Sequence, residues 1–177
     1  MLKKLIAILF FLPLLGSTCQ FGSAHFESNL KNFSFNPDGT IFAYVENKSD
    51  SNGAESRLIH VMMTWISIDP GRDLNDFGET QKNLIIQTFK KHDRLYMTFD
   101  NNGTIVSFWI QTEMPGVNVD KLSKVASLQS YHIDDYTVSG KLIFEDSAPL
   151  IGGTFTAPIL QGKAAEIAKQ NWEELTK

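Results

Sequence analysis

Residues 131–136, YHIDDY, hold the side chains whose types and spacing are best suited to chemistry. In an extended segment, residues two positions apart face the same side, so His132 and Asp134 would lie next to each other. A carboxylate beside an imidazole orients the ring and selects its tautomer, as general acid–base catalysis requires. No second catalytic group is indicated nearby, which favours a solvent-exposed strand end over an acid–base site.

Other patterns for catalysis or metal binding fail in the sequence. There is no GxSxG elbow, and the four histidines lie in separate segments without HExxH or another paired spacing. The acids near Asp73 do not form a calcium loop, because the fifth position counted from Asp73 is Phe77 and the twelfth is Leu84. We therefore expect no metal and no cofactor, and the sequence argues against an enzyme more than for one.

Residues 1–18 have the pattern of a secretory signal peptide. Lys3 and Lys4 precede an apolar run over residues 5–15, which is shorter than the roughly 20 residues of a membrane-spanning helix. Small residues place the cleavage between about positions 18 and 24. The remaining chain, residues 25–177, is predicted to be a single globular β-rich domain in the periplasm or outside the cell.

Cys19, the only cysteine, directly follows this segment. It resembles the acylated cysteine of bacterial lipoproteins, in which a leucine usually stands three positions earlier and a small residue directly before. Gly16 and Thr18 hold those places here, so a soluble exported form and a form anchored through lipid on Cys19 are both alternatives. One cysteine allows no intramolecular disulfide, so burial of a core must stabilise the domain.

The chain is acidic, with 20 acidic and 16 basic side chains and a formal net charge of −4. Removal of residues 1–18 would take away two lysines and no acid. Nucleic acids and anionic lipids are bound through clusters of basic side chains, and the sequence has none. Both are therefore excluded as expected partners.

The strongest structural signal lies in residues 95–112, where two apolar runs flank Asn102-Gly103. Asn-Gly is the preferred pair of a two-residue type I′ hairpin turn, which would place Phe99 opposite Val106. One face of the hairpin would then be wholly apolar: Leu95, Met97, Phe99, Val106, Phe108 and Ile110. The other face carries Tyr96 and Trp109, which are candidate binding residues because aromatic side chains are common at interfaces.

Apolar periodicity predicts the remaining elements. A first hairpin is expected to join residues 33–35 to 40–45 through a bulged type I turn at 36–39, followed by an exposed loop over 46–57. Further strands are predicted over 58–68, 136–144 and 150–157, and helices over 80–92, 120–130 and 163–175.

Three of these elements allow more detailed predictions. The 58–68 strand is apolar on both faces, which predicts a central strand with His60 as a hydrogen-bonded core residue. Gly152 and Gly153 indicate a bulge. The last helix has a narrow apolar stripe that should dock on the sheet: Ala165, Ala168, Trp172 and Leu175.

These elements predict an α+β fold, predominantly antiparallel β, with six or seven strands in a sandwich or open barrel and two or three helices including a C-terminal amphipathic one. The first functional hypothesis is an exported, non-catalytic envelope or secreted protein that binds a protein partner or a small apolar ligand. The alternatives are an envelope hydrolase with its site at His132 and Asp134, and a β-barrel carrier of an apolar ligand.

Overall fold

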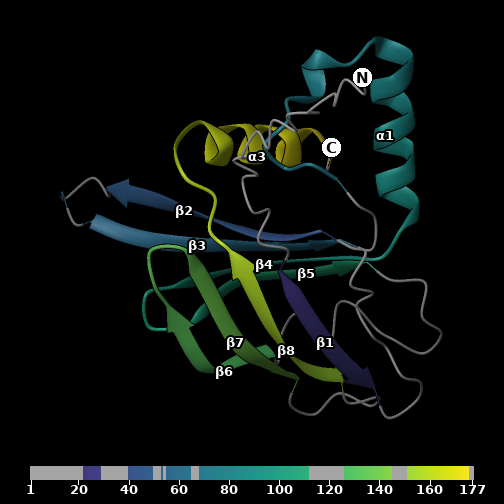
Figure 1. The fold of residues 1–177 in the computed structure, drawn as a ribbon. Coiled ribbons are helices and arrows are strands. Elements are labelled where there is room, and N and C mark those ends of the chain that lie inside the picture. The colour runs from purple at the N-terminus through teal and green to yellow at the C-terminus, as the bar shows by residue number, and fades with distance from the viewer. Residues whose placement is uncertain are drawn as a thin grey trace, which may run out of the picture.

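The computed structural model describes residues 22–28, 40–49, 53, 55–64, 68–111, 126–144 and 151–175. In these residues eight strands form two antiparallel four-stranded sheets (Figure 1). One sheet has the order β1 (Ser23–Ser28), β8 (Ile151–Pro158), β7 (Thr137–Phe144) and β6 (Ala126–Ile133). The other has the order β2 (Ile41–Ser49), β3 (Glu55–Thr64), β4 (Arg94–Asp100) and β5 (Ile105–Gln111). The predominantly antiparallel class is confirmed, with eight described strands instead of six or seven.

The two sheets share one apolar core, so the arrangement is sandwich-like. Phe26, Leu142 and Phe155 enter it from the first sheet, while Ile59 and Met97 enter from the second, and each is at most 2% exposed. Alternate residues of each strand face inward, as the pleat requires. The sheet β2–β5 carries a second buried cluster on its other side, so β3 is covered on both faces as predicted for residues 58–64.

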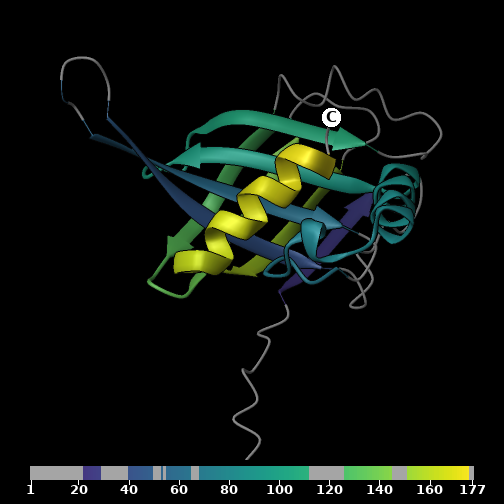
Figure 2. The same ribbon diagram turned by 90° about the horizontal axis from the view of Figure 1, so that it is seen from above.

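Two α-helices are on the outer side of the β2–β5 sheet, where the C-terminal one lies across the strands and the other stands upright at one end of them (Figures 1 and 2). A short 3-10 helix, η1 (Leu74–Asp76), precedes the upright one. The two α-helices are α1 (Glu79–Lys91) and α3 (Gly162–Leu175), which confirm the helices predicted over 80–92 and 163–175. The ring of Trp172 on α3 stacks on Tyr96 at 5.2 Å and meets Phe89 of α1 edge-on at 5.6 Å. The predicted stripe of α3 therefore docks on the sheet. Neither helix of the described part has the length and apolar character needed to cross a membrane.

The turn of the β4–β5 hairpin differs from the predicted two-residue loop. Phe99 pairs with Ile105 and not with Val106, so that prediction is wrong. The carbonyl of Asp100 accepts the N–H of Gly103 at 3.0 Å, and its carboxylate accepts the N–H groups of Asn102 at 2.9 Å and Thr104 at 2.8 Å. This side-chain capping favours a three-residue loop ending in a left-handed glycine, and Gly103 has φ of +79°.

A bulge then restores the faces of β5. The register shifts next to Val106, whose side chain is 60% exposed. The extra residue of the bulge reverses the alternation of inward and outward side chains along β5. Phe108 and Ile110, which lie beyond the bulge, therefore still enter the core. Ile105 takes the inward place that the two-residue loop would have given to Val106.

The hairpin of β2 and β3 is longer than the sequence indicated. Residues 46–57 were expected to form a loop, but β2 continues to Ser49 and β3 begins at Glu55. Strand β4 ends opposite Leu58, so the outer part of the hairpin is a two-stranded ribbon that projects beyond the sheet (Figure 2). Its polar residues suit a ribbon with both faces near water, which explains why their composition indicated a loop.

Two further predictions need correction. Residues 126–130 were assigned to a helix, but they begin strand β6, where Leu128 pairs with Leu142 of β7 and the neighbouring strand overrides the local three-residue spacing. Gly152 and Gly153 form no bulge, since β8 pairs with β1 and β7 in continuous register. A Cβ at Gly153 would lie 2.1 Å from the carbonyl oxygen of His25, so this glycine allows the close approach of β1.

Several predictions concern residues outside the described ranges. These are the signal peptide and its cleavage site, Cys19, the turn over 36–39 with its partner residues 33–35, the end of the central strand over 65–67, and the start of the helix predicted over 120–130.

Candidate functional site

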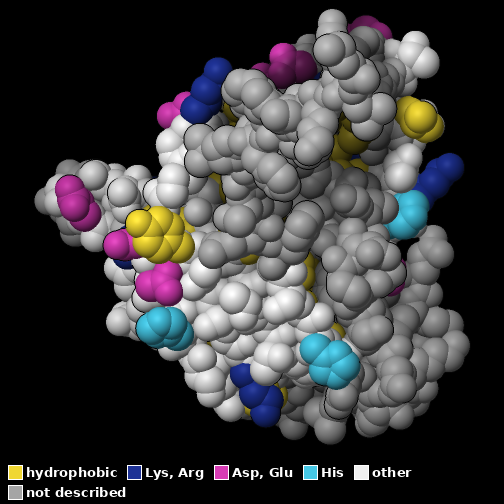
Figure 3. Space-filling view, viewed as in Figure 1, with side chains coloured by type: hydrophobic (Ala, Val, Ile, Leu, Met, Phe, Trp, Pro, Cys, Tyr) yellow, Lys and Arg dark blue, Asp and Glu magenta, His cyan; other side chains and the backbone are white. Residues whose placement is uncertain are grey.

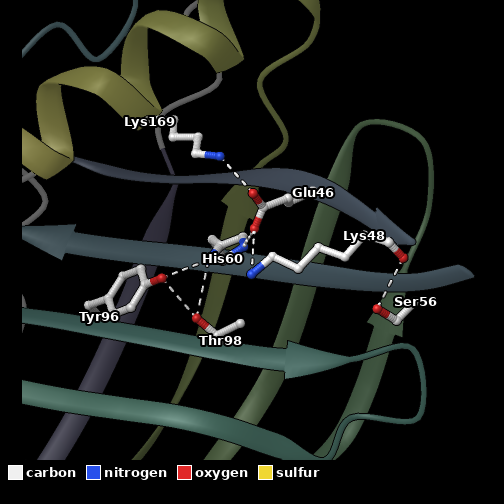
Figure 4. A network of polar contacts seen from close by, with 7 residues as sticks. All are labelled: Glu46, Lys48, Ser56, His60, Tyr96, Thr98 and Lys169. Carbon is white, nitrogen blue, oxygen red and sulfur yellow. Dashed lines mark hydrogen bonds and ion pairs between the residues drawn. The ribbon is translucent and has the colours of Figure 1, made fainter. Parts of the chain in front are cut away.

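A polar network lies on the outer face of the β2–β5 sheet, beneath α3 (Figure 4). His60 stands on the central strand β3, and Tyr96 and Thr98 stand on β4 beside it. The Glu46 carboxylate lies between His60 and Lys169 of α3 in Figure 4. Alternation along neighbouring strands brings these residues to one face, while α3 supplies the amine from above.

Two hydroxyl groups on β4 contact His60. Nδ1 of the ring lies 2.7 Å from the Tyr96 hydroxyl and 3.1 Å from Thr98 Oγ1, and Thr98 Oγ1 donates to the Tyr96 hydroxyl at 2.9 Å. With Thr98 donating to Tyr96, we assign Tyr96 as the donor to Nδ1 and place the proton of the neutral ring on Nε2. Nε2 faces Glu46 Oε2 at 3.3 Å, without the alignment of a hydrogen bond.

Burial keeps the centre of the network neutral. His60 is 6% exposed, and the ring of Tyr44 stacks on it at 4.6 Å. Burial lowers the pKa of His60 and outweighs the opposing effect of the Glu46 carboxylate. Burial also raises the pKa values of Tyr44 and Tyr96, so both phenols stay protonated.

Glu46 is the negatively charged residue of the network and pairs with two lysines. Lys169 Nζ donates to its Oε1 at 2.6 Å, and Lys48 Nζ lies 3.3 Å from its Oε2. The hydrogen bond from Lys169 is the main cause that lowers the pKa of Glu46 to about 2, and the same bond raises the pKa of Lys169. The ion pair therefore links α3 to the edge strand β2.

The network fastens the helix to the sheet. His60, Tyr96 and Glu46 line neither the pocket that contains Arg57 and Tyr136 nor the pocket beside Trp172. His60 is thus a hydrogen-bonded core residue, as the sequence predicted. Sequence reasoning missed Glu46 and Lys169, because residues separated by 123 positions give no local signal of their contact.

The candidate acid–base pair has a different geometry. His132 is exposed near the end of β6, where it pairs with Ser139 of β7. The Asp134 carboxylate accepts the N–H groups of Tyr136 and Thr137, each at 2.7 Å, and the Thr137 hydroxyl at 2.9 Å. These hydrogen bonds lower the pKa of Asp134. They favour a role in the β6–β7 turn, and catalysis at this pair stays a prediction.

The aromatic candidates Tyr96 and Trp109 are cross-strand partners on β4 and β5. Both are half-buried and belong to the cluster between the sheet and the helices. The guanidinium of Arg94 lies 5.0 Å from the ring centre of Trp109 and 4.5 Å from that of Phe89. Both candidates thus face a packed interface, and ligand binding by them stays a prediction.

An open groove lies where the projecting hairpin meets the rest of the molecule. Its volume is about 510 Å³, and its described lining comes from β2, β3, the β6–β7 turn and the segment before α3: Val45, Asn47, Arg57, Asp135, Tyr136 and Gln161. We call these six residues the hairpin groove. Its lining is mainly polar, and the Tyr136 side chain is 70% exposed.

Backbone contacts position the walls of the hairpin groove. The N–H of Leu160 donates to the carbonyl of Ala43 on β2 at 2.8 Å, which brings the chain leaving β8 beside the hairpin. Gln161 Nε2 then donates to the carbonyl of Asp135 at 2.8 Å. These contacts hold the β6–β7 turn against the segment before α3, so the groove has fixed walls.

Charges are dispersed on the visible face of the molecule. Figure 3 shows acidic, basic and histidine side chains spread singly over its described part, without a large cluster of one sign. Within the described ranges, no group of three or more histidine, cysteine or acidic side chains converges as a metal site would require.

No protein-family model, curated protein or solved structure matches this chain.

Proposed function

We propose that the protein is an exported, non-catalytic binding module that recognises a partner protein at the hairpin groove. The observation that carries this proposal is the groove itself, a hollow of about 510 Å³ with polar walls and an exposed tyrosine at its rim. Polar, partly aromatic surfaces of this kind are typical of recognition sites, in which a few anchors supply most of the binding energy.

The packed core supports a protein partner over a small apolar ligand. A carrier needs an internal apolar cavity of roughly 300 Å³ or more. Ile59, Val61, Met97 and Leu142, which meet between the sheets, are all 0% exposed. A pocket beneath α3 has a volume of only about 30 Å³. Binding at the surface therefore fits this molecule better than carriage inside it.

The hydrogen bonds of Asp134 weigh against the hydrolase alternative, because they engage its carboxylate with the turn beside His132. Export is supported by the apolar run over residues 5–15 behind two lysines. Cys19 leaves attachment to a membrane through lipid as the alternative to a soluble form.

The test is capture of partners from an envelope extract with the tagged, exported protein and its Tyr136→Ala variant. We expect a specific partner that the variant retains at least about tenfold less, because loss of an aromatic anchor costs a binding site on the order of 1–2 kcal/mol or more. Leu84→Ala is the matched control, since Leu84 is also an exposed large side chain, at 63%, and lies on α1.

Retention of every captured protein by Tyr136→Ala would contradict the groove as the binding surface. Absence of any partner with the folded parent protein would contradict the binding module itself.

A further inference from the structure

Building on the proposed binding role, we infer that Arg57 is a specificity residue of the hairpin groove and that it recognises a carboxylate group of the ligand. Arg57 lies in the groove wall on the two-stranded part of the hairpin, directly opposite Asn47. Arg57 as a whole residue is half-buried, and it lies in the wall of a hollow and not on a flat surface. A charge pair formed beside the low-dielectric protein is stronger than one formed in bulk water.

No described residue supplies such an anionic partner to Arg57. Among the described residues, no carboxylate forms an ion pair with Arg57 and no acceptor forms a hydrogen bond with it, although Glu55 stands two positions away on the same strand face. A guanidinium has five N–H donors in a planar fork that matches the two oxygens of a carboxylate. The groove therefore presents a donor array for which the described chain has no acceptor.

Asp135 restricts the charge of the bound group. It lines the same groove, so a ligand carrying two negative charges at one group would be repelled more strongly than a carboxylate. Asn47 and Gln161 also line the groove, and their amides can bind polar groups next to the carboxylate. The chemistry therefore fits a carboxylate on a polar chain, which the proposed partner protein would supply as an acidic peptide segment.

The test is a titration of the isotope-labelled, exported protein followed by NMR. The acidic probes are a tetraglutamate peptide with blocked termini and digalacturonate, and the neutral probes are the matching tetraglutamine peptide and the neutral galactose disaccharide. We expect an acidic probe to shift groove resonances, including the Arg57 Nε–H, at concentrations where its neutral counterpart does not. Tetraglutamate should bind more tightly than digalacturonate, and the opposite order would overturn the assignment of a peptide.

Two variants give opposite expected results. Arg57→Gln should weaken binding of the acidic probe about tenfold or more, because it removes the charge and the fork. Asp135→Asn should strengthen that binding about threefold, because it removes a like charge. Arg72→Gln is the control, since the guanidinium of Arg72 lies 4.2 Å above the Phe77 ring, outside the groove lining.

Equal binding of acidic and neutral probes, or unchanged binding by Arg57→Gln, would overturn the carboxylate inference while groove binding itself stands. The reverse signs for Arg57→Gln and Asp135→Asn would also overturn it, because they would show that Arg57 does not attract the acidic probe. Absence of groove shifts with both acidic probes would overturn it too, and the partner capture with Tyr136→Ala decides independently whether the proposed function stands.

Discussion

His60 shows how one buried side chain can make stability depend on pH. Six neighbours on three elements surround it with titratable, charged or hydroxyl groups: Tyr44, Glu46, Lys48, Tyr96, Thr98 and Lys169. Because burial lowers the pKa of His60 in the folded state, the unfolded chain binds a proton more readily. The stability associated with neutral His60 is therefore present above the unfolded pKa of about 6.5 and is lost as pH falls towards the folded value.

The corresponding prediction concerns His60→Phe, which keeps an aromatic ring and removes the titration. The variant should be less stable than the parent near pH 8, because the Tyr96 hydroxyl loses its acceptor. The difference in free energy of unfolding should narrow between about pH 7 and pH 5, where only the parent gains the proton on unfolding. Urea denaturation across this range measures it. A difference that stays constant with pH would contradict the coupling.

This pH range separates His60 from Glu46. The pKa of Glu46 is lowered from 4.5 to about 2, so its stabilising effect is present above about 4.5 and disappears only as pH falls towards 2. Both proteins in the comparison contain Glu46, and above pH 5 it stays charged in both. A narrowing of the difference in free energy of unfolding between the two proteins would therefore arise from His60.

At the scale of elements, the β4–β5 hairpin depends on one glycine in its turn. Gly103 has φ of +79°, and a Cβ added there would lie 3.4 Å from the Tyr131 side chain. Gly103→Ala should lower the free energy of unfolding by about 1–2 kcal/mol, because a side chain in the left-handed region is strained. Thermal or urea unfolding measures the loss.

Gly71→Ala is the control for this hairpin prediction. Gly71 also lies in a surface turn, but its φ is not positive and an added Cβ would make an ordinary contact at 3.6 Å with Ala164. Its replacement should change stability by no more than about 0.5 kcal/mol. Equal effects of the two substitutions would contradict the role of the left-handed turn.

At the scale of the whole molecule, β1 forms one edge of the β1-β8-β7-β6 sheet by pairing with β8. Its Phe26 is 1% exposed and belongs to the core between the sheets. Gly153 permits this pairing, because any Cβ there would overlap the backbone of His25 and Phe26. A substitution at Gly153 in β8 is thus expected to affect the pairing of β1.

We predict that Gly153→Ala displaces β1 and lowers the free energy of unfolding by about 3 kcal/mol, as expected for severe overpacking. Gly152→Ala, whose Cβ would meet the nearest atom at 3.5 Å, should stay within about 0.5 kcal/mol of the parent. Urea unfolding measures both, and amide exchange of residues 23–28 should accelerate in Gly153→Ala alone. Unchanged protection of β1 in that variant would show that the close approach is not limiting.

Much of the fold was predictable because periodicity is a local property. A run that is apolar on both faces identified the central strand around His60, and apolar patterns also identified the strands over 136–144 and 150–157. The apolar stripe identified α3 with Trp172 on its buried side. The same reasoning failed over 46–57, where the polar composition of a projecting ribbon resembles that of a loop. It also failed at Leu128, whose spacing fits a helix until β7 supplies a pairing partner.

The sequence by itself determined the inward-facing residues of β4 and of the C-terminal helix, since the pleat and the helical repeat act over a few neighbouring positions. It also determined that the chain is acidic and has a single cysteine. The tertiary structure alone decided the bulge at Val106, the contact of Glu46 with Lys169 and the meeting of Arg57 with Tyr136 in one groove. These three features depend on how separate strands and helices stack. Contacts between segments that are far apart in the chain cannot be recognised from the order of neighbouring residues.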